Sequence, residues 1–371
     1  MRWTTTLAPM LTLAATSCLL ASALAQPAPD VTTDAAGPDW RVGAQRFGVA
    51  QAPVKAEGTI RIATYNIENM FDGVDDPVSP RDDVEWQKPA EEVAAVAAAI
   101  RALGADILAI QEIESEDVLR AFRDEHLKGM GYDHLASIDT GDQRGIEQGV
   151  LSRFPIAEAK SFGQIPLGGI HPEKYGNQDN WYAGEPINFR RGPLQVTIEV
   201  PAQSDAQDDT AEPYTLTLFN IHHKSGRYNG YWREAEAKKL VEIIATSGLK
   251  PSDNIVILGD FNAQMGDGVV EQYLDLGFRD VMGHAAQHAA DEDGHAELDP
   301  KHVTHESGRA IDHLLVSAGM TREIVRGSAF VLGTTARQEG ISYRDYPPPE
   351  GYAADHYPVA VDIRPRDGGT R

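Results

Sequence analysis

Short apolar segments alternate with helical patterns along residues 59–363, and this alternation restricts the chain to a small set of folds. Residues 254–258 illustrate the strands, and residues 88–103, with Ala and Val at helical spacing, illustrate the helices. Strands that alternate with helices in this way pack into mixed sheets with the helices outside. We therefore predict one α/β domain at residues 58–365, followed by a tail at residues 366–371.

The same patterns locate the other parts of the domain. Strands are expected at residues 59–63, 106–110, 149–152, 214–221, 310–316, 330–332 and 357–363, and helices at residues 116–127 and 232–245. Residues 163–192 and 284–305 have the composition of insertions, and residues 202–213 that of a polar hairpin tip. The second insertion is rich in His and in acidic residues. It suits either a Zn²⁺ site or, as we expect, a solvated acidic loop.

Four of the predicted strands lie next to side chains that can bind a cation or move a proton. In chain order, the groups at these strand ends are Asn66, Glu112, Asp260 with Asn262, and Asp355 with His356. Alternation along an extended chain sends Asp260 and Asn262 to the same face. Each group alone is also common in a turn at the end of a strand. Gathered along one sheet edge, they would suit the hydrolysis of a phosphate ester with a divalent cation.

Taken in this order, the motifs resemble those of the endonuclease/exonuclease/phosphatase superfamily. Its members include deoxyribonuclease I-like nucleases, abasic-site endonucleases, neutral sphingomyelinases and inositol-polyphosphate phosphatases. The resemblance covers residues 59–363 and implies a deoxyribonuclease I-like fold. That fold is a four-layer α/β sandwich with two packed mixed β-sheets flanked by helices, and its site lies at their upper rim. A divalent cation is the implied cofactor, with Mg²⁺ expected first and Mn²⁺ or Ca²⁺ as alternatives.

The resemblance also implies which residues hold the cation and activate water. Glu112 is expected to be the principal metal ligand, and Asp355 is expected to face the metal. Asp260 and His356 are expected to activate the attacking water. Asp312 matches the family's supporting acid, which orients the ring of the catalytic His.

The expected contacts to the phosphate oxygens come from Asn66, Asn262 and His222. The family places a His two residues before a Lys-Ser at this strand end, which selects His222 over His223. Strand alternation turns His223 to the other face, where a packing or surface role is expected. His313 is expected to be structural or solvent-facing.

The net charge of -23 excludes binding of nucleic acid through a broad basic face. A polyanionic substrate would therefore need a local patch, for which Arg190, Arg191 and Lys224 are the candidates. Relatives carry an Arg near this place that contacts the scissile phosphate. Because Arg190 and Arg191 are adjacent, either of them can match this Arg. For the one that does not contact the phosphate, exposure at the surface is an equal expectation.

The N-terminus has the pattern of a secretory signal peptide at residues 1–25. Arg2 precedes an apolar stretch, and Ala23-Leu24-Ala25 forms a small-x-small cleavage site. Residues 26–57 are expected to be an exposed lead-in, and a mature chain without Cys18 would contain no cysteine. We expect an exported protein, periplasmic or secreted, that is a monomer without a stable membrane anchor. Lipoprotein processing and a single membrane anchor are the weaker alternatives.

The function implied by the resemblance is that of an exported metal-dependent phosphodiesterase. The first expectation is a nuclease that hydrolyses DNA without sequence specificity. The second is a sphingomyelinase-like or small-molecule phosphodiesterase or phosphatase, because aromatic side chains of the first insertion suit bases and lipid head groups alike. These side chains are Tyr175, Trp181, Tyr182 and Phe189. A non-catalytic phosphate-ligand binding protein on the same scaffold is the alternative from another class.

Overall fold

The computed structural model describes residues 39–75, 86–201, 213–283, 298–342 and 344–366. Two six-stranded mixed sheets form the centre of this part of the chain. Across the first sheet, the strands are β16 (Phe330–Val331), β18 (Val359–Ile363), β2 (Ile60–Met70), β3 (Ile107–Ile113), β5 (Glu147–Ser152) and β4 (His134–Ser137). Across the second sheet, they are β14 (Arg279–Asp280), β15 (Asp312–Val316), β13 (Ile255–Asp260), β12 (Tyr214–His222), β11 (Leu194–Val200) and β6 (Ile156–Ser161).

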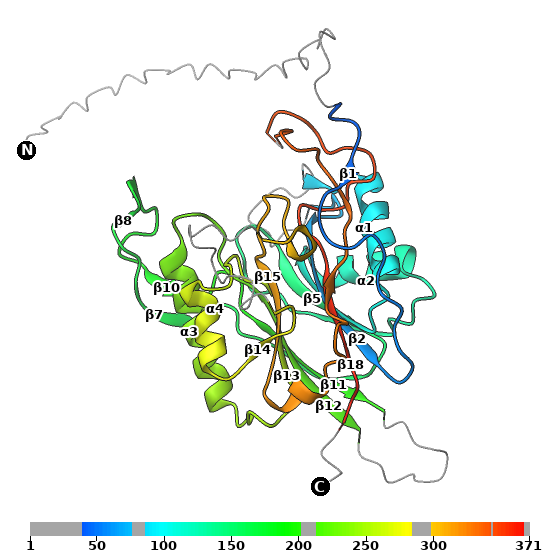
Figure 1. Cartoon of the computed structure of the whole chain (residues 1–371). Helices are drawn as coiled ribbons and strands as arrows, with labels where there is room; N and C mark the ends of the chain where they lie inside the picture. The colour runs from blue at the N-terminus through cyan, green and yellow to red at the C-terminus, as the bar shows by residue number, and fades with distance from the viewer. Residues whose placement is uncertain (1–38, 76–85, 202–212, 284–297, 343, 367–371) are drawn as a thin grey trace, which may run out of the picture. The chain divides into compact units, whose positions relative to one another are not determined.

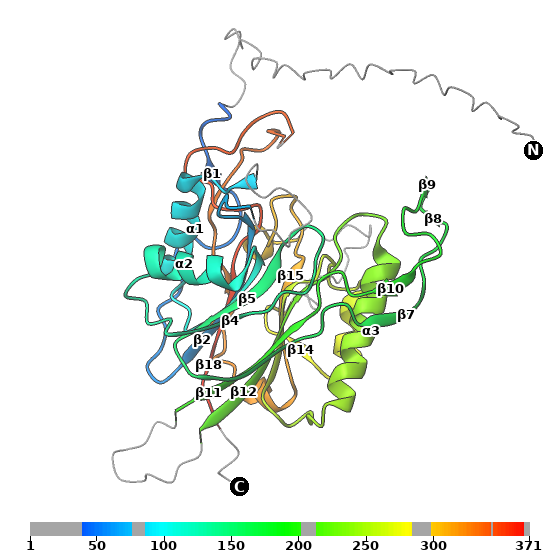
Figure 2. The same ribbon diagram turned by 180° about the vertical axis from the view of Figure 1, so that it is seen from behind.

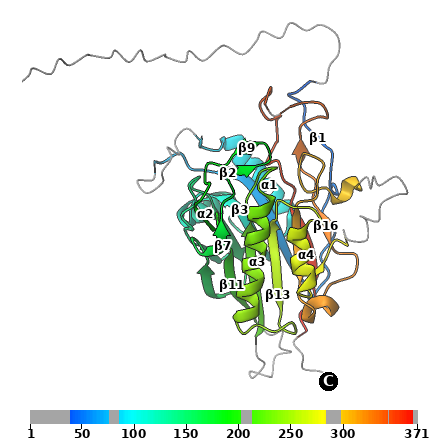
Figure 3. The same cartoon turned by 90° about the vertical axis from the view of Figure 1, so that its left-hand side faces the viewer.

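Helices cover the outer face of each sheet (Figures 1 and 2). The helices α1 (Ala90–Leu103) and α2 (Glu116–His126) lie on the first sheet. The helices α3 (Gly230–Thr246) and α4 (Gly268–Asp275) lie side by side in front of the second sheet in Figure 3. These four layers confirm the predicted α/β sandwich with two packed mixed sheets flanked by helices.

Three apolar layers hold the sandwich together, because the central strands are buried on both faces. Along β3, Ile107 and Ala109 belong to the core between the sheets, whereas Leu108 and Ile110 pack with residues of α1 and α2. The same alternation divides β13 between the core of the two sheets and the layer beneath α3 and α4. Burial on both faces explains why these strands are continuous apolar runs in the sequence.

Each sheet contains one parallel strand pair, and the two pairs place polar side chains at one edge. β2 runs parallel to β3 with Asn66 opposite Gln111, and β12 runs parallel to β13 with His222 opposite Asp260. β15 and β18 are antiparallel to their neighbours β13 and β2, so they begin where the parallel pairs end. Residues that open β15 or precede β18 therefore reach the same edge.

Gly259 permits β12 and β13 to approach each other closely just before Asp260. Its φ angle is 138°, and a Cβ atom at this position would lie 2.0 Å from the carbonyl oxygen of Ile221. Any side chain would therefore push the two strands apart at the end that carries the polar residues.

Several elements differ from those expected. β2 and β3 continue to Met70 and Ile113, beyond the predicted ends, and β11 and α4 were not predicted. The first insertion forms two small hairpins, β7 (Pro166–Ile170) with β10 (Pro186–Asn188) and β8 (Lys174–Tyr175) with β9 (Gln178–Asp179). The hairpin of β8 and β9 projects away from the sheets beside α3 (Figure 2).

The expected lead-in joins the compact unit from Asp39 onward. β1 (Ala44–Gln45) pairs with β17 (Thr335–Ala336), and Phe47 packs against the core between the sheets. The predicted signal peptide, the hairpin tip at residues 202–212 and most of the His-rich insertion lie outside the described residues. Among the helices within the described ranges, none has the length and apolar character needed to cross a membrane.

Candidate active site

His356 is held by a chain of hydrogen bonds at the edge where β15 and β18 begin. Its Nδ1 lies 2.8 Å from Asp312 Oδ2, and the hydroxyl of Thr304 donates to the same oxygen at 2.7 Å. The backbone N–H groups of Ile311 and Asp312 donate in turn to the Thr304 hydroxyl. These bonds orient the ring so that Nε2 faces Asp260 Oδ2 at 3.8 Å.

The charge of His356 reflects its acidic surroundings. Burial alone would lower the pKa of His356, but the carboxylates of Asp312, Asp355 and Asp260 outweigh burial and raise the pKa well above its usual value. The imidazole is therefore protonated as long as all three carboxylates are ionised and no other cation lies beside them.

Asp260 accepts hydrogen bonds from two amides. Asn262 donates from its backbone at 2.8 Å and from its side chain at 2.9 Å, and Asn66 Nδ2 lies 3.3 Å from Asp260 Oδ2. Asn262 has a φ angle of 49°, the left-handed conformation that brings its side chain back onto Asp260. Burial raises the pKa of Asp260 to about 7; Asp312 and Glu112 add to the increase, while His356 opposes it.

Glu112 lies between the two sheets at the end of β3, with a φ angle of 67°. Its Oε1 is 3.4 Å from Asn66 Nδ2, and its Oε2 accepts from the backbone of Asn69 at 3.0 Å. Arg144 donates to Oε2 at 3.1 Å and also to the Asn69 side chain. Arg144 was not predicted, because it lies on a loop that belongs to none of the motifs in the sequence.

His222 and His223 face opposite sides of β12. His222 Nε2 lies 3.4 Å from Asp260 Oδ2 and 3.6 Å from Glu112 Oε1. Burial lowers the pKa of His222 well below its usual value, with Arg191 and Arg144 adding to the effect, so this ring is neutral. His223 instead contacts the hydroxyl of Tyr273 at 2.8 Å on the helix side of the sheet.

The predicted basic patch is largely occupied by internal contacts. Arg190 Nε lies 2.7 Å from Asp142 Oδ1, and Arg191 donates to the backbone oxygens of His222 and His223. The Arg190 side chain is 16% exposed and the Arg191 side chain only 4%. Burial lowers the pKa of Lys224 to about 8, with the two arginines adding to the effect.

Asp355 lies beside two residues that were not among the predicted site residues. Its backbone N–H donates to Glu68 Oε2 at 3.1 Å, and its Oδ2 lies 3.4 Å from His305 Nε2. Burial raises the pKa of Glu68 to about 7, with Asp355 adding to the effect. Glu68 follows Asn66 by two positions, but its φ angle is 52° and the strand pairing is irregular there, so strand alternation alone could not have identified it.

Two groups of side chains bring at least three potential cation ligands within 4.8 Å of one another in the described residues. One consists of Asp260, Asp312 and His356, and the other of His305, Asp355 and His356. Glu112 belongs to neither group, and its Oε2 lies 3.1 Å from Arg144. Burial raises the pKa values of Asp260 and Glu68, and neighbouring carboxylates add to the effect, so several acids lie close together away from water. Such a site fits a hard divalent cation.

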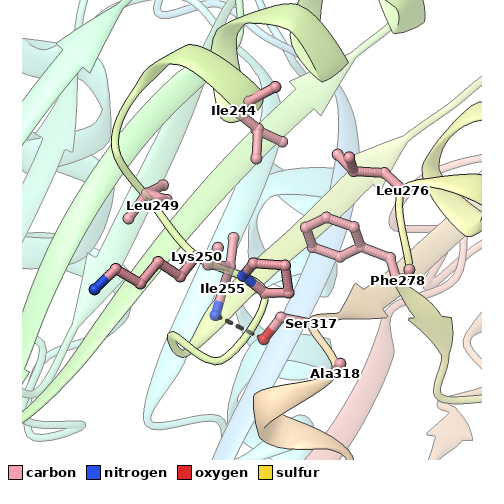
Figure 4. A pocket seen from close by; sticks show the side chains of 11 residues that line it. Ile244, Leu249, Lys250, Ile255, Leu276, Phe278, Ser317 and Ala318 are labelled. Atoms are coloured by element: carbon pink, nitrogen blue, oxygen red, sulfur yellow. Dashed lines mark hydrogen bonds between the residues drawn. The ribbon is translucent and has the colours of Figure 1, made fainter.

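An apolar cavity of about 200 Å³ lies at the opposite end of β13 (Figure 4). Ile244, Leu249, Ile255 and Phe278 are among the residues that line it. Ile255 begins β13 and Asp260 ends it, so the length of the strand separates this cavity from the acidic cluster. The cavity takes no part in the candidate active site.

Carboxylate, amide and imidazole groups that converge at one edge of two packed sheets define a hydrolase site of the kind that works with a divalent cation. The sequence profile of the Endonuclease/Exonuclease/phosphatase family matches residues 63–332, and the chain belongs to this family. Members of the family hydrolyse phosphoester bonds and generally depend on divalent metals. This chain is accordingly a phosphoesterase, and its acidic and His groups are candidate metal ligands.

Solved structures of similar fold share little sequence with the chain. An endonuclease/exonuclease/phosphatase from Bacteroides vulgatus has a TM-score of 0.50 at 14% identity, with 83% of this chain and 99% of that chain covered. The catalytic domain of human nocturnin, with a bound sulfate anion, has a TM-score of 0.49 at 13% identity, with 84% and 95% covered. A mannosyl-6-phosphatase from Bacteroides thetaiotaomicron has a TM-score of 0.46 at 17% identity, with 82% and 99% covered. No curated protein matches the chain significantly.

Proposed function

We propose that this phosphoesterase is a phosphodiesterase that cleaves nucleic-acid backbones, DNA first, by in-line attack of water. The observation that carries the proposal is the ring of His356. It is held by Asp312 at 2.8 Å, and its Nε2 faces Asp260 across a gap of 3.8 Å. The amides of Asn66 and Asn262 converge on that same carboxylate.

Proton transfer is assigned to the pair formed by His356 and Asp260. A bound divalent cation, with Mg²⁺ proposed first, would neutralise charge on the phosphate and on the surrounding carboxylates. With that negative charge balanced, Nε2 of His356 loses much of the stabilisation that keeps it protonated, and it can accept the proton of the attacking water. Asp260 lies close enough to orient that water. Asp312 keeps the imidazole in one tautomer and orientation throughout.

The phosphate oxygens are assigned to neutral donors. The amide groups of Asn66 and Asn262 lie beside Asp260, and His222 approaches the same carboxylate from β12 at 3.4 Å. A neutral imidazole can donate a hydrogen bond to a non-bridging oxygen without adding a fixed positive charge. Donors of this kind stabilise the charge that develops in the transition state.

Glu112 and Asp355 are the proposed carboxylate ligands of the cation. Glu112 is only 10% exposed at its side chain, and Arg144 now neutralises it at 3.1 Å. The Asp355 side chain is 33% exposed, which leaves room for water and substrate around it. His222, Asp260 and His356 form a series of close contacts between these two carboxylates, with separations of 3.4 to 3.9 Å.

A lipid or small-molecule phosphodiesterase or phosphatase is the second candidate. The observation that favours it is Trp181, which is 89% exposed next to the projecting hairpin and suits a lipid surface as well as a base. Phe189 is buried and Tyr182 packs against His171 and Trp232, so these two aromatic residues are not available for substrate. Export to the periplasm or the medium, with residues 1–25 removed, is part of the same proposal.

A substrate panel tests the proposal. Purified protein beginning at Gln26 would be given plasmid DNA, RNA, sphingomyelin vesicles, bis-p-nitrophenyl phosphate or p-nitrophenyl phosphate, with Mg²⁺, Mn²⁺, Ca²⁺ or a chelator. We expect DNA cleavage that requires the cation. The His356→Ala protein, purified in the same way, should not cleave DNA, and this result would exclude a contaminating nuclease. Intact DNA with every cation, together with hydrolysis of sphingomyelin or a small substrate, would replace the nuclease assignment with the second candidate.

A further inference from the structure

His305 is the last residue of the predicted His-rich insertion, and it lies against the proposed catalytic ring. Its ring centroid is 4.6 Å from that of His356 in an edge-on arrangement, and its backbone pairs with that of His356. The next residue, Glu306, donates its backbone N–H to the carbonyl oxygen of Asp355 at 2.7 Å. Residues 305 and 306 therefore follow the backbone of the Asp-His pair.

Neighbouring hydrogen bonds define the tautomer of His305. The backbone N–H of Ser307 donates to His305 Nδ1 at 3.0 Å, and an atom that accepts an N–H cannot carry a hydrogen of its own. The Ser307 hydroxyl lies 2.7 Å from the same nitrogen and itself accepts from Arg309 Nε at 2.8 Å. The neutral imidazole must then carry its hydrogen on Nε2.

That hydrogen faces Asp355. His305 Nε2 lies 3.4 Å from Asp355 Oδ2, while Asp355 Oδ1 lies on the side of His356 Nε2 at 3.9 Å. For Nε2 to bind a cation, the ring would have to move its hydrogen to Nδ1, where the Ser307 N–H already points. The hydrogen bonds thus make His305 a donor to the carboxylate and exclude it as a ligand in this arrangement.

We propose that His305 is a positioning residue, which holds Oδ2 of Asp355 so that Oδ1 is directed toward the cation and the reacting phosphate. This inference rests on the proposed role of Asp355 as a metal ligand. A carboxylate that is 33% exposed and has no such donor would rotate freely, and rotation weakens its contribution to a metal site. Loss of a partner that orients a metal ligand typically lowers metal affinity or activity by about 10- to 100-fold.

The test compares variants that keep or remove the donor. His305→Gln places an amide N–H near the position of Nε2, whereas His305→Phe keeps a ring against His356 but donates nothing. His305→Ala is a second variant without a donor, in case the Phe protein does not fold. Ser307→Ala is the matched control, because its backbone N–H remains and still specifies the tautomer.

Mn²⁺ binding to metal-free protein would be measured by titration calorimetry, and kcat would be measured at saturating Mn²⁺. We expect His305→Phe and His305→Ala to bind Mn²⁺ about tenfold or more weakly, with kcat nearly unchanged once the cation saturates. His305→Gln and Ser307→Ala should stay within about threefold of the unchanged protein.

Three results would overturn the inference. One is Mn²⁺ affinity in His305→Phe and His305→Ala equal to that of the unchanged protein. Another is an equal loss in His305→Gln and His305→Phe, which would make the ring nitrogen itself a ligand. The third is that the unchanged protein binds no Mn²⁺, since there would then be no cation for which His305 could position Asp355. Failure of the proposed function is distinguishable from these results, because it would appear as normal Mn²⁺ binding without cleavage of any phosphodiester.

Discussion

At the scale of single residues, the site depends on which face of a strand a side chain occupies. His222 and His223 are adjacent, yet one contacts Asp260 at 3.4 Å and the other contacts Tyr273 at 2.8 Å beneath the helices. Chemical type alone cannot separate two such residues. The two-residue period of the strand turns them to opposite faces, and the family's His before Lys-Ser selected His222. The two histidines therefore provide a matched pair for mutagenesis.

His222→Ala should lower kcat by at least about 10²-fold, since it removes a donor to the transition state. His223→Ala should leave kcat of the folded enzyme within about threefold but lower the melting temperature, because it opens a cavity next to Tyr273. Steady-state kinetics and thermal unfolding of both proteins check this. If His223→Ala proved inactive while folded and His222→Ala proved active, the roles assigned to the two faces of β12 would be reversed.

Thr304 offers a finer test of the support behind His356. Thr304→Val keeps the shape but removes the donor to Asp312 Oδ2, and loss of a hydrogen bond to a charged group costs about 1.5 kcal/mol or more. We expect kcat to fall roughly tenfold, with a changed pH profile, because the orientation of His356 loosens. Thr304→Ser retains the hydroxyl and should behave as the unchanged protein. A Thr304→Val enzyme with full kcat at every pH would show that this hydroxyl has no part in the reaction.

At the scale of elements, the alternation of strands and helices predicted mixed sheets with helices outside, whereas the four layers were implied by the resemblance to the family. The polar ends of β2, β3 and β13 marked the edge that carries the site. β11 also alternates buried and exposed residues, so its signal was present although it was not predicted. Arg144 and Thr304 could not have been predicted, because each lies on a loop and acquires its partner only through tertiary packing. The two-residue strand β1 carries no periodic signal and pairs with β17 far along the chain.

Gly259→Ala tests the close approach of β12 and β13. A Cβ atom 2.0 Å from the Ile221 carbonyl oxygen must push the strands apart, and a φ angle of 138° is strained for any residue with a side chain. We expect a loss of roughly 2 kcal/mol or more in the free energy of unfolding, together with a fall in kcat. Gly268→Ala is the control, since the nearest atom to its added Cβ is 3.8 Å away and the residue begins a helix. Equal stability of both variants in urea titrations would contradict the argument.

At the scale of the whole molecule, buried acids make stability depend on pH. Burial raises the pKa of Glu147 from its ordinary 4.5 to about 8, while its hydrogen bonds with Thr140 oppose the shift. The folded state then holds a proton that the unfolded state releases. The stability contributed by this proton is fully present below about pH 4.5 and is lost as the pH rises through about 8.

Glu147→Gln should therefore flatten the pH dependence of the free energy of unfolding. The glutamine at this position cannot ionise. The free energy of unfolding of the variant should therefore rise relative to that of the unchanged protein between pH 5 and pH 9, by roughly a few kcal/mol. Urea unfolding at several pH values measures this difference. Glu158→Gln, a substitution on the exposed side of β6, should leave the pH dependence unchanged. Parallel stability curves for Glu147→Gln and the unchanged protein would show that Glu147 is ionised in the fold.

The residues of the site come from the whole length of the domain, and their order in the sequence has a consequence for the nascent chain. Asn66 and Glu112 are synthesised early, Asp260 and Asp312 follow, and His356 comes last, just before β18 takes its place between β16 and β2. A nascent chain that has folded its second sheet therefore still lacks His356, the hydrogen-bond partner of Asp312. With His356 as the proposed base, we expect the nascent chain to be inactive until its final strand has docked, so a phosphoesterase made inside a cell would become reactive only near the end of its synthesis.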